Sequence, residues 1–361
     1  MGLIINGYLD VIDKNRSFPY IFEDGHLTVY SENSLPLDDK RSSLAKGITT
    51  KQAFVVGSNL ANQENIIFFI DHMPFSGKFG SICTSTSPKV YYYIVLRPSV
   101  ESLLIDKVAF KFPELDYFYN TRHGIDATYD KSIFSLKTVP WKDTQWAFLF
   151  SLNNQKIGCN LTVSQILKTD SNTPLYLESV LGCEFNKTSD IPLILNIYST
   201  VKRLFCFLCF RKNININNID LYGRTKDLKA KIGELHIQFE HIKDNEEDKV
   251  IQKTIRLEYL QRLFPELSQL VADDNLYFEH IPNNSEDAHH VTIARVILNT
   301  AACEWTFEQC YKTFAVSGYR EQVKSDILDL LEGLPGKNNY NSKKKSELKD
   351  IKRLFPELTA V

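Results

Sequence analysis

The aromatic and basic residues of this chain are its clearest candidates for binding chemistry. In one apolar run, the two-residue period of a strand puts Tyr91, Tyr93 and Arg97 on a single face. Exposed rings in such a row would form a platform on which bases or sugars stack. Packing against a second sheet or a helix is the simpler use of the same rings, and Trp141 and Trp146 leave the same two possibilities open.

Further basic residues gather at Arg211 and Lys212, at Arg224 and Lys226, and in the tail between residues 337 and 353. Lysine and arginine contact phosphates, so these residues join the tyrosine row as candidate contacts for RNA or another ligand. Charged runs are more often solvated surface, and the net charge of −2 gives the whole chain no attraction to nucleic acid. Any such binding requires a local patch.

Two other patterns are similar to metal or redox sites, but we predict structural roles for both. Cys206 and Cys209 have the spacing of a redox or zinc pair, yet their neighbours are apolar, which raises the pKa of a thiol. Glu234, His236 and Glu240 share a strand face, where alternating polar residues usually face water. We therefore predict neither a metal nor a cofactor.

The sequence contains no catalytic signature. It has no glycine-rich phosphate loop of the Walker type and no Gly-x-Ser-x-Gly elbow. His289 and His290 are neighbours in an expected helix, where they point about 100° apart and do not easily share one ion. A hydrolase would instead need a pocket that gathers His72, His123 or Cys159 beside carboxylates, so we predict no catalytic residue.

The elements that carry these residues change in kind near residue 190. Before it, apolar residues alternate or form short runs, as in strands; after it, helical spacing appears. We predict an α+β protein with a β-rich domain, a sandwich or distorted barrel, over residues 1–250 and a helical region over 251–336. A basic connector and a terminal amphipathic helix complete the chain at 337–361.

Short apolar runs between turn-rich stretches predict the strands of the front domain, although they do not give the pairing order. We expect loops at 31–47 and 116–131. The expected strands are Ile4–Ile12, His26–Tyr30, Ala53–Val56, Ile66–Ile70, Val90–Leu96, Val108–Phe112, Trp146–Leu152, Leu161–Val163, Leu175–Leu181, Asn213–Tyr222 and Glu234–Phe239.

Helical spacing predicts helices at Ser285–Phe314, Glu321–Leu331 and Glu347–Leu358, the first with a cap among Asn283–Ser285. The string Phe-Pro-Glu-Leu occurs three times at unequal spacing, so it is no repeat array. Proline in the first turn of a helix explains it locally.

The segment Ile191–Phe210 is long and apolar enough to cross a bilayer. Lys202 and Arg203 interrupt it, and each basic residue costs roughly 2.5–3.5 kcal/mol near the bilayer centre. Asp190 suits a helix cap and Pro192 suits a first turn. We therefore predict a buried helix of a soluble protein and no membrane partner.

The cysteines and the start of the chain indicate a cellular compartment. Seven scattered cysteines fit a reducing cytoplasm better than a disulfide framework. The first residues have no basic region, no adequate apolar core and no cleavage site of a secretory signal. We predict a cytoplasmic protein.

Four stretches share the order and character of elements in a known family. Lys107–Phe118 is similar to a stretch of the ApeA-type N-terminal domain, and Ile191–Phe210 followed by Asn213–Tyr222 looks like the closing helix and strand of that domain. Ala294–Trp305 is similar to the helix that opens a HEPN domain. The chain thus resembles bacterial anti-phage abortive-infection proteins. In that family the HEPN part is a helical, usually dimeric, metal-independent ribonuclease.

The sequence departs from this family at the residues that cut RNA. HEPN nucleases carry an arginine followed after four to six residues by a histidine that acts as acid or base at the ribose 2′-hydroxyl. No arginine here has a histidine at that spacing, and the last histidine is His290. The resemblance therefore implies either a shortened HEPN part, which the final unpartnered helix favours, or a member without nuclease activity.

We expect a defence protein whose β-rich domain senses RNA or a phage-derived trigger, and whose chain, as given, binds rather than cuts. The helical region, if complete, would form a homodimer. Two alternatives stay open: a carbohydrate- or peptide-binding β-sandwich with a helical oligomerisation tail, and an unrecognised hydrolase.

Overall fold

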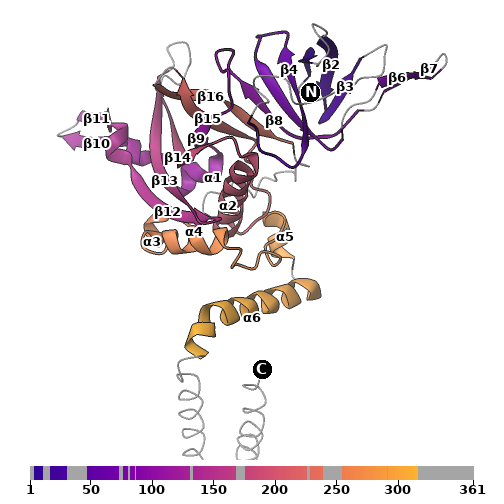
Figure 1. The fold of residues 1–361 in the computed structure, drawn as a ribbon. Coiled ribbons are helices and arrows are strands. Elements are labelled where there is room, and N and C mark those ends of the chain that lie inside the picture. The colour runs from indigo at the N-terminus through magenta and orange to yellow at the C-terminus, as the bar shows by residue number, and fades with distance from the viewer. Residues whose placement is uncertain are drawn as a thin grey trace, which may run out of the picture. The chain divides into compact units, whose positions relative to one another are not determined.

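The computed structural model describes residues 4–10, 17–30, 47–72, 76–79, 82–85, 87–130, 133–167, 175–225, 228–238, 254–290 and 292–315. The chain divides into two compact units, Met1–Val291 and Thr292–Val361. The first unit is mostly antiparallel strand with a few helices (Figure 1), which confirms the α+β prediction and the β-rich front. This unit runs past the expected boundary at residue 250, because a helix after that position packs on the sheet.

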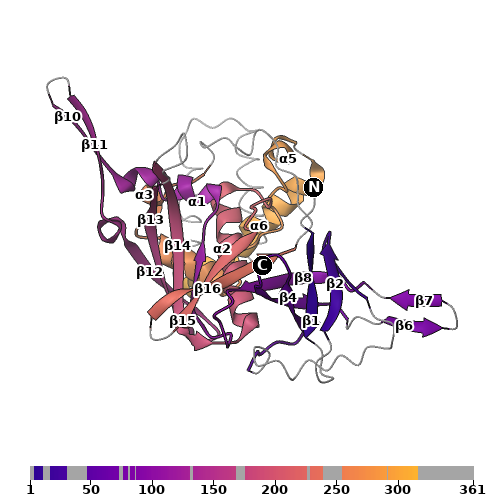
Figure 2. The same cartoon turned by 90° about the horizontal axis from the view of Figure 1, so that it is seen from above.

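A 12-stranded antiparallel sheet is the frame of the first unit, with strands in the order β12-β13-β14-β9-β15-β16-β8-β5-β4-β1-β2-β3. The hairpins β6–β7 (Ser76–Phe79 and Ile82–Ser85) and β10–β11 (Ile125–Asp130 and Ile133–Thr138) extend away from it (Figure 2). The sheet strands are β1 (Ile5–Asp10), β2 (Ser17–Glu23), β3 (His26–Val29), β4 (Ala53–Asn59), β5 (Asn65–Ile70), β8 (Val90–Leu96), β9 (Ile105–Phe110), β12 (Trp146–Leu152), β13 (Gln155–Leu167), β14 (Leu175–Thr188), β15 (Asn218–Thr225) and β16 (Leu228–Ile237).

Strand β3 closes one end of the sheet into a small barrel. The amide of Leu27 donates to the Pro88 carbonyl at 3.0 Å, and the amide of Val90 donates to the Gly25 carbonyl at 2.8 Å. These bonds join β3 to the start of β8, so β8, β5, β4, β1, β2 and β3 form a ring. Its interior buries Leu9, Tyr20, Phe22, Leu27, Phe68 and Tyr93, among others.

Helix α2 (Ile191–Cys209) is buried in the core of the remaining sheet. Its first amide, that of Ile191, donates to the Thr49 carbonyl at 3.1 Å, whereas the Asp190 side chain makes no capping bond. Pro192 lies in the first turn as predicted, and Phe210 ends the helix with a left-handed backbone. The helix is long and apolar enough to span a membrane, yet 61% of that stretch is buried inside the protein, as in a core helix.

Most predicted strands are present, and the sequence marks the limits of β8 and β12 correctly. The expected loop at 116–131 is wrong, because this stretch contains the end of α1 (Pro113–Phe118), a 3-10 turn and β10. Strand β2 was not expected. Pro19 breaks its apolar pattern, although the strand is paired on both sides.

Short helices follow the sheet in the first unit: α3 (Leu257–Leu260), α4 (Phe264–Ala272) and α5 (Ser285–His289). Asn284 caps α5 by accepting a bond from the Asp287 amide at 2.8 Å. The expected helix Ser285–Phe314 is interrupted, because the backbone of His290 is extended; α6 (Ile293–Ala315) belongs to the second unit.

Two Phe-Pro-Glu-Leu strings stand at the starts of α1 and α4, where proline occupies the first turn. This confirms their local explanation. The third string, the expected helices at 321–331 and 347–358, the 31–46 part of the first expected loop and the connector lie outside the described residues.

Candidate binding groove

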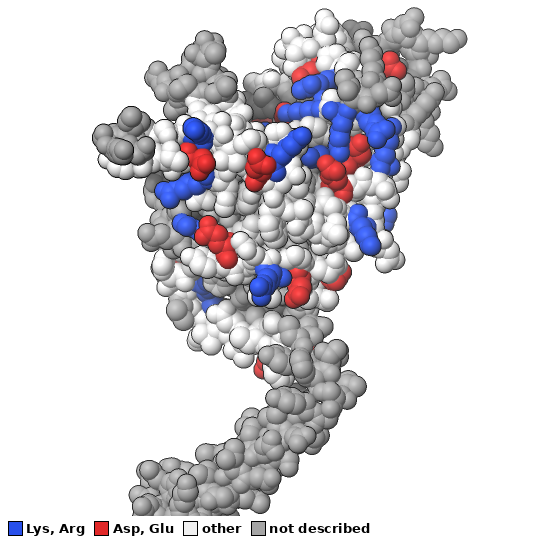
Figure 3. Space-filling view, turned by 90° about the vertical axis from the view of Figure 1, so that its left-hand side faces the viewer, with Lys and Arg blue, Asp and Glu red and all other residues white. Residues whose placement is uncertain are grey.

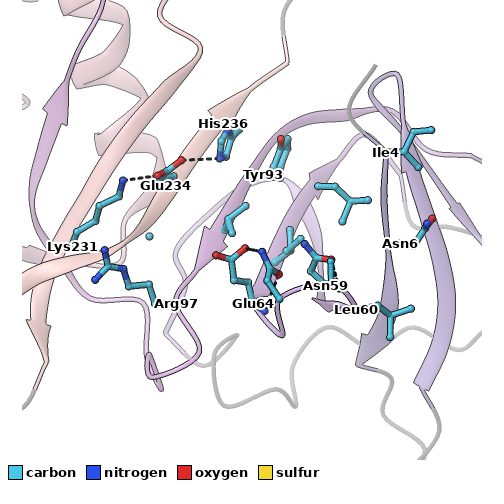
Figure 4. Close-up of a pocket in the computed structure, with 16 residues that line it drawn as sticks. Ile4, Asn6, Asn59, Leu60, Glu64, Tyr93, Arg97, Lys231, Glu234 and His236 are labelled. Carbon is cyan, nitrogen blue, oxygen red and sulfur yellow. Dashed lines mark hydrogen bonds and ion pairs between the residues drawn. The ribbon is translucent and has the colours of Figure 1, made fainter. Parts of the chain in front are cut away.

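A groove of about 700 Å³ opens where the barrel meets the rest of the sheet. Strands β8 and β16 form one wall, and β1 with the turn between β4 and β5 forms the other (Figure 4). The first wall carries the charged side chains Arg97, Lys231, Glu234 and His236. The second presents amides and aliphatic groups from Ile4, Asn6, Asn59, Leu60 and Asn62, with Glu64 at the end of the turn.

The β4–β5 turn is held by its own hydrogen bonds. The side chain of Asn59 accepts from the Ala61 amide at 3.0 Å, and the Leu60 amide donates to the Asn6 carbonyl of β1 at 3.0 Å. The Asn62 side-chain amide donates to Glu64 at 2.5 Å, which occupies one oxygen of that carboxylate. This wall of the groove is therefore preformed.

A close approach of two strands shapes the opposite wall. A Cβ placed on Gly233 of β16 would lie 2.3 Å from the Val95 carbonyl of β8. Real side chains do not tolerate such a distance, so glycine is required for β8 and β16 to pair here. Their pairing puts Glu234 opposite Val95 and His236 opposite Tyr93.

Glu234 lies between two basic side chains (Figure 4). Lys231 contacts Glu234 at 2.5 Å and Asp220 at 2.6 Å, while Nε2 of His236 lies 3.4 Å from Glu234. Burial would raise the pKa of Glu234, but the bond and charge of Lys231 lower it overall. Burial would likewise lower the pKa of Lys231, yet its two carboxylate partners raise it overall. Both groups are thus charged and occupied with each other.

His236 is neutral at neutral pH. Burial lowers its pKa, and the nearby Glu234 opposes this only in part. The imidazole stacks on the ring of Tyr93 with centroids 4.7 Å apart and planes at 10°. Burial raises the pKa of Tyr93 to about 12, so this phenol stays protonated. The part of the His236 ring that is exposed therefore gives the groove a neutral surface beside the Glu234 carboxylate, and Tyr93 supports it from below.

Arg97 is the cation in the groove that is available to a ligand. Its side chain is exposed just after β8, and among the described residues it has no ion-pair partner. Its backbone amide donates to the Ile232 carbonyl at 2.9 Å, so the base of the side chain is fixed. An arginine fork held in this way can form two parallel bonds to a phosphate or carboxylate.

The predicted tyrosine row divides into buried and exposed members. Tyr93 is 2% exposed and touches Phe22 and Phe68 in the barrel, whereas Tyr91 on the same strand is 40% exposed. Only Tyr93 and Arg97 line the groove. Trp141 is exposed, and Trp146 packs on Phe148 and Phe264.

The predicted basic residues are dispersed rather than gathered in one patch. Arg211 is buried, and its guanidinium donates to Glu114 at 2.5 Å and to Asn213 at 2.8 Å, so it braces the interior. Lys212 pairs with Glu279 at 3.4 Å. Arg224 is exposed with no ion pair to another described residue, and Lys226 lies outside the described residues.

The charged side chains on this face of the sheet pair with one another, lysine with carboxylate. On the strands beyond the groove, Lys111 contacts Glu178 at 2.6 Å and Lys229 contacts Glu184 at 3.2 Å. In the face drawn in Figure 3, acidic groups lie between the basic ones. A long phosphate backbone would find few unpaired cations there.

The cysteines and remaining histidines do not assemble a second site in the described part of the chain. Burial raises the pKa of Cys206 to about 11 and that of Cys209 to about 12, as expected for core thiols. His72 pairs with Asp71, His123 stacks on Tyr119, and neither lines the groove. Cys159 is buried beside Cys183 with the sulfurs 3.2 Å apart. Among the described residues, no three His, Cys, Asp or Glu side chains could hold a metal.

Sequence reasoning missed Glu64 and the three asparagines of the groove. Glu234 and His236 were recognised as sharing a strand face, but not as neighbours of Arg97, because strand order brings them together. Comparison with known proteins adds no relative: no family model, curated protein or solved structure matches the chain.

Proposed function

We propose that residues 1–291 form a recognition module that binds a ligand in the groove between the barrel and the sheet. The observation that carries this is an exposed Arg97, without an ion-pair partner among the described residues, in a preformed groove of about 700 Å³ beside the neutral His236 that stacks on Tyr93. Groove size and a mixture of apolar surface with a few directed polar groups are typical of ligand sites. The described residues that line the groove include no serine, threonine or cysteine that a neighbouring base could activate.

The wider role that we propose follows from the resemblance to abortive-infection proteins. In this proposal the module is cytoplasmic and senses RNA or a phage-derived trigger, and the helical region beyond it carries the response and dimerises. The absence of an Arg–His pair at HEPN spacing in the sequence favours binding over cutting.

The alternative functions gain less support from the geometry. A carbohydrate-binding sandwich needs an exposed aromatic face at Tyr91 and Tyr93, but only Tyr91 is exposed, and it lies outside the groove lining. A hydrolase needs His72, His123 or Cys159 in one pocket, and none of them lines the groove. The geometry therefore supports these two alternatives less well than it supports the binding of a polar ligand.

A phage-challenge experiment tests the proposal. Asn6 is exposed on the groove wall of β1, so Asn6→Trp should fill the groove without disturbing the core. Tyr8→Trp is the matched control, because Tyr8 is exposed on the same strand outside the groove lining. We expect bacteria that express the wild-type chain or Tyr8→Trp to restrict phage plaques, and bacteria that express Asn6→Trp to lose this protection.

Two results would contradict the proposal. Equal protection by Asn6→Trp and wild type would remove the groove from recognition, and no protection by the wild type would remove the defence role. Specific metal-independent cleavage of total tRNA by the purified chain would show that it cuts as well as binds.

A further inference from the structure

The charges that line the groove leave a single free positive group. Lys231 is held by Asp220 and Glu234, and His236 is neutral because burial lowers its pKa. Glu64 adds a carboxylate at the opposite wall, where the Asn62 side-chain amide donates to one of its oxygens. Among the described lining residues, Arg97 therefore supplies the only cation that is not already neutralised by a carboxylate.

This distribution favours a ligand with a single compact anionic group. The Arg97 fork can bind one compact anionic head through two parallel hydrogen bonds. A polyanion threaded along the groove would bring further negative groups toward Glu234 and Glu64, and like charges at short range oppose binding. A ligand with one anionic head and a neutral body meets both conditions.

The rest of the groove suits a neutral, partly apolar body. The aliphatic side chains of Ile4 and Leu60 are 51% and 58% exposed on the wall opposite Arg97. Burial of such groups under a ligand removes apolar surface from water and so stabilises the complex. The volume of about 700 Å³ exceeds what a lone phosphate ion needs, so the head alone would leave most of the groove unfilled.

We propose that the groove binds a terminal phosphate monoester on Arg97 and places the attached nucleoside against the aliphatic wall. This inference rests on the proposed binding role of the groove and names the class of ligand. The same phosphate head and first nucleoside are present in a free mononucleotide and at the 5′ end of a short RNA, whose remaining phosphates would lie outside the groove.

Calorimetric titration of the full chain tests the assignment. The probes are adenosine 5′-monophosphate, adenosine, inorganic phosphate, and a hexaribonucleotide with either a 5′-phosphate or a 5′-hydroxyl. We expect the monophosphate to bind at least tenfold more tightly than adenosine or phosphate alone. Arg97→Gln should weaken its binding at least tenfold, because glutamine removes the positive charge and the two parallel donors of the guanidinium.

Arg224→Gln is the matched control. Arg224 is an exposed arginine of the same unit without an ion pair to another described residue, and it does not line the groove. This variant should bind the monophosphate within twofold of wild type. Arg97→Lys should recover only part of the lost affinity, since lysine keeps the charge but lacks the planar fork.

The two oligonucleotides distinguish the source of the phosphate. Tighter binding of the 5′-phosphorylated hexamer than of the mononucleotide, lost in Arg97→Gln, would assign the head to an RNA end. Equal binding of the 5′-hydroxyl hexamer would overturn the proposal, as would unchanged affinity in Arg97→Gln or no binding of any probe. If the probes fail while Asn6→Trp still abolishes phage protection, the ligand class is wrong and the recognition role stands.

Discussion

The two faces of the β8–β16 pair lie in different surroundings, although alternate residues of the same two strands form them. On one face, Tyr92, Ile94 and Leu96 are 5% exposed or less and belong to the core that contains α2. On the other, exposure rises along β8 from Tyr93, at 2%, through half-buried Val95 to exposed Arg97. The first face is closed within the core to which α2 also belongs, whereas the second passes from barrel core to open groove.

Arg97 and Arg211, which were both predicted as ligand contacts, show the same contrast between open and enclosed surroundings. Arg211 is enclosed on the α2 side, where Glu114 and Asn213 use its donors. Arg97 stands on the groove side with its donors open to a ligand. Identical side chains thus serve as a brace in one region and as a binding group in the other, and burial with a partner makes the difference.

The largest loss of stability should come from removing the buried ion pair between Arg211 and Glu114. Arg211→Ala leaves the Glu114 carboxylate buried without its guanidinium, and removal of one partner of a buried pair costs about 3–5 kcal/mol. Lys212→Ala is the neighbouring control: its pair with Glu279 is largely exposed and should cost less than about 1 kcal/mol. Urea unfolding followed by tryptophan fluorescence measures both. Similar losses in the two variants would contradict the contrast between sealed and open regions.

A smaller loss is expected where β8 and β16 approach each other. Gly233→Ala places a Cβ 2.3 Å from the Val95 carbonyl, so the strands must separate at the groove wall. Overpacking of this kind costs about 1–3 kcal/mol. Gly158→Ala in β13 is the control, because its Cβ would meet Leu149 at 3.7 Å, an ordinary contact. The free energies of unfolding should differ by more than about 1 kcal/mol, and equal values would mean that the wall tolerates a side chain.

Much of this fold could be predicted because alternation and helical spacing report local structure. The limits of β8 and β12 and the helix at Ile191–Cys209 follow from apolar period and from Pro192. The hairpin β10–β11 could not be recognised in the same way. Its Tyr129 and Leu136 are exposed, so no buried face imposed an apolar period on it.

Only one wall of the groove could be predicted from the sequence. Period alone put Tyr93 and Arg97 on one face of β8, but the pattern does not say whether that face meets water or a core. The opposite wall comes from Asn6 and the turn at Asn59, which reach the site through strand order. Because strand order depends on pairing across long loops, one sequence read locally does not supply it.

The finest test of the contrast is the pH dependence of stability that His236 should impose. Burial lowers the pKa of this imidazole in the folded protein, below the value near 6.5 that it has when unfolded. Between these two values the unfolded chain binds more protons, so the stabilising contribution is complete above pH 6.5 and is lost as pH falls. Glu234 and Asp220 oppose the lowering, while Lys231 adds to it; Tyr93 stacks on the ring without charge.

His236→Gln should therefore flatten the fall in unfolding free energy between pH 7 and pH 5, by at most about 1.4 kcal/mol per pH unit for a single group. His280, whose pKa burial also lowers, is retained in the variant and contributes to the remaining slope. Glu234→Gln should act in the opposite direction: without this carboxylate the pKa of His236 falls further, and its NMR titration moves to lower pH. An unchanged slope in His236→Gln, or a titration of His236 above pH 6.5, would show that the imidazole is solvated and that the groove is open to water as far as the Tyr93 ring.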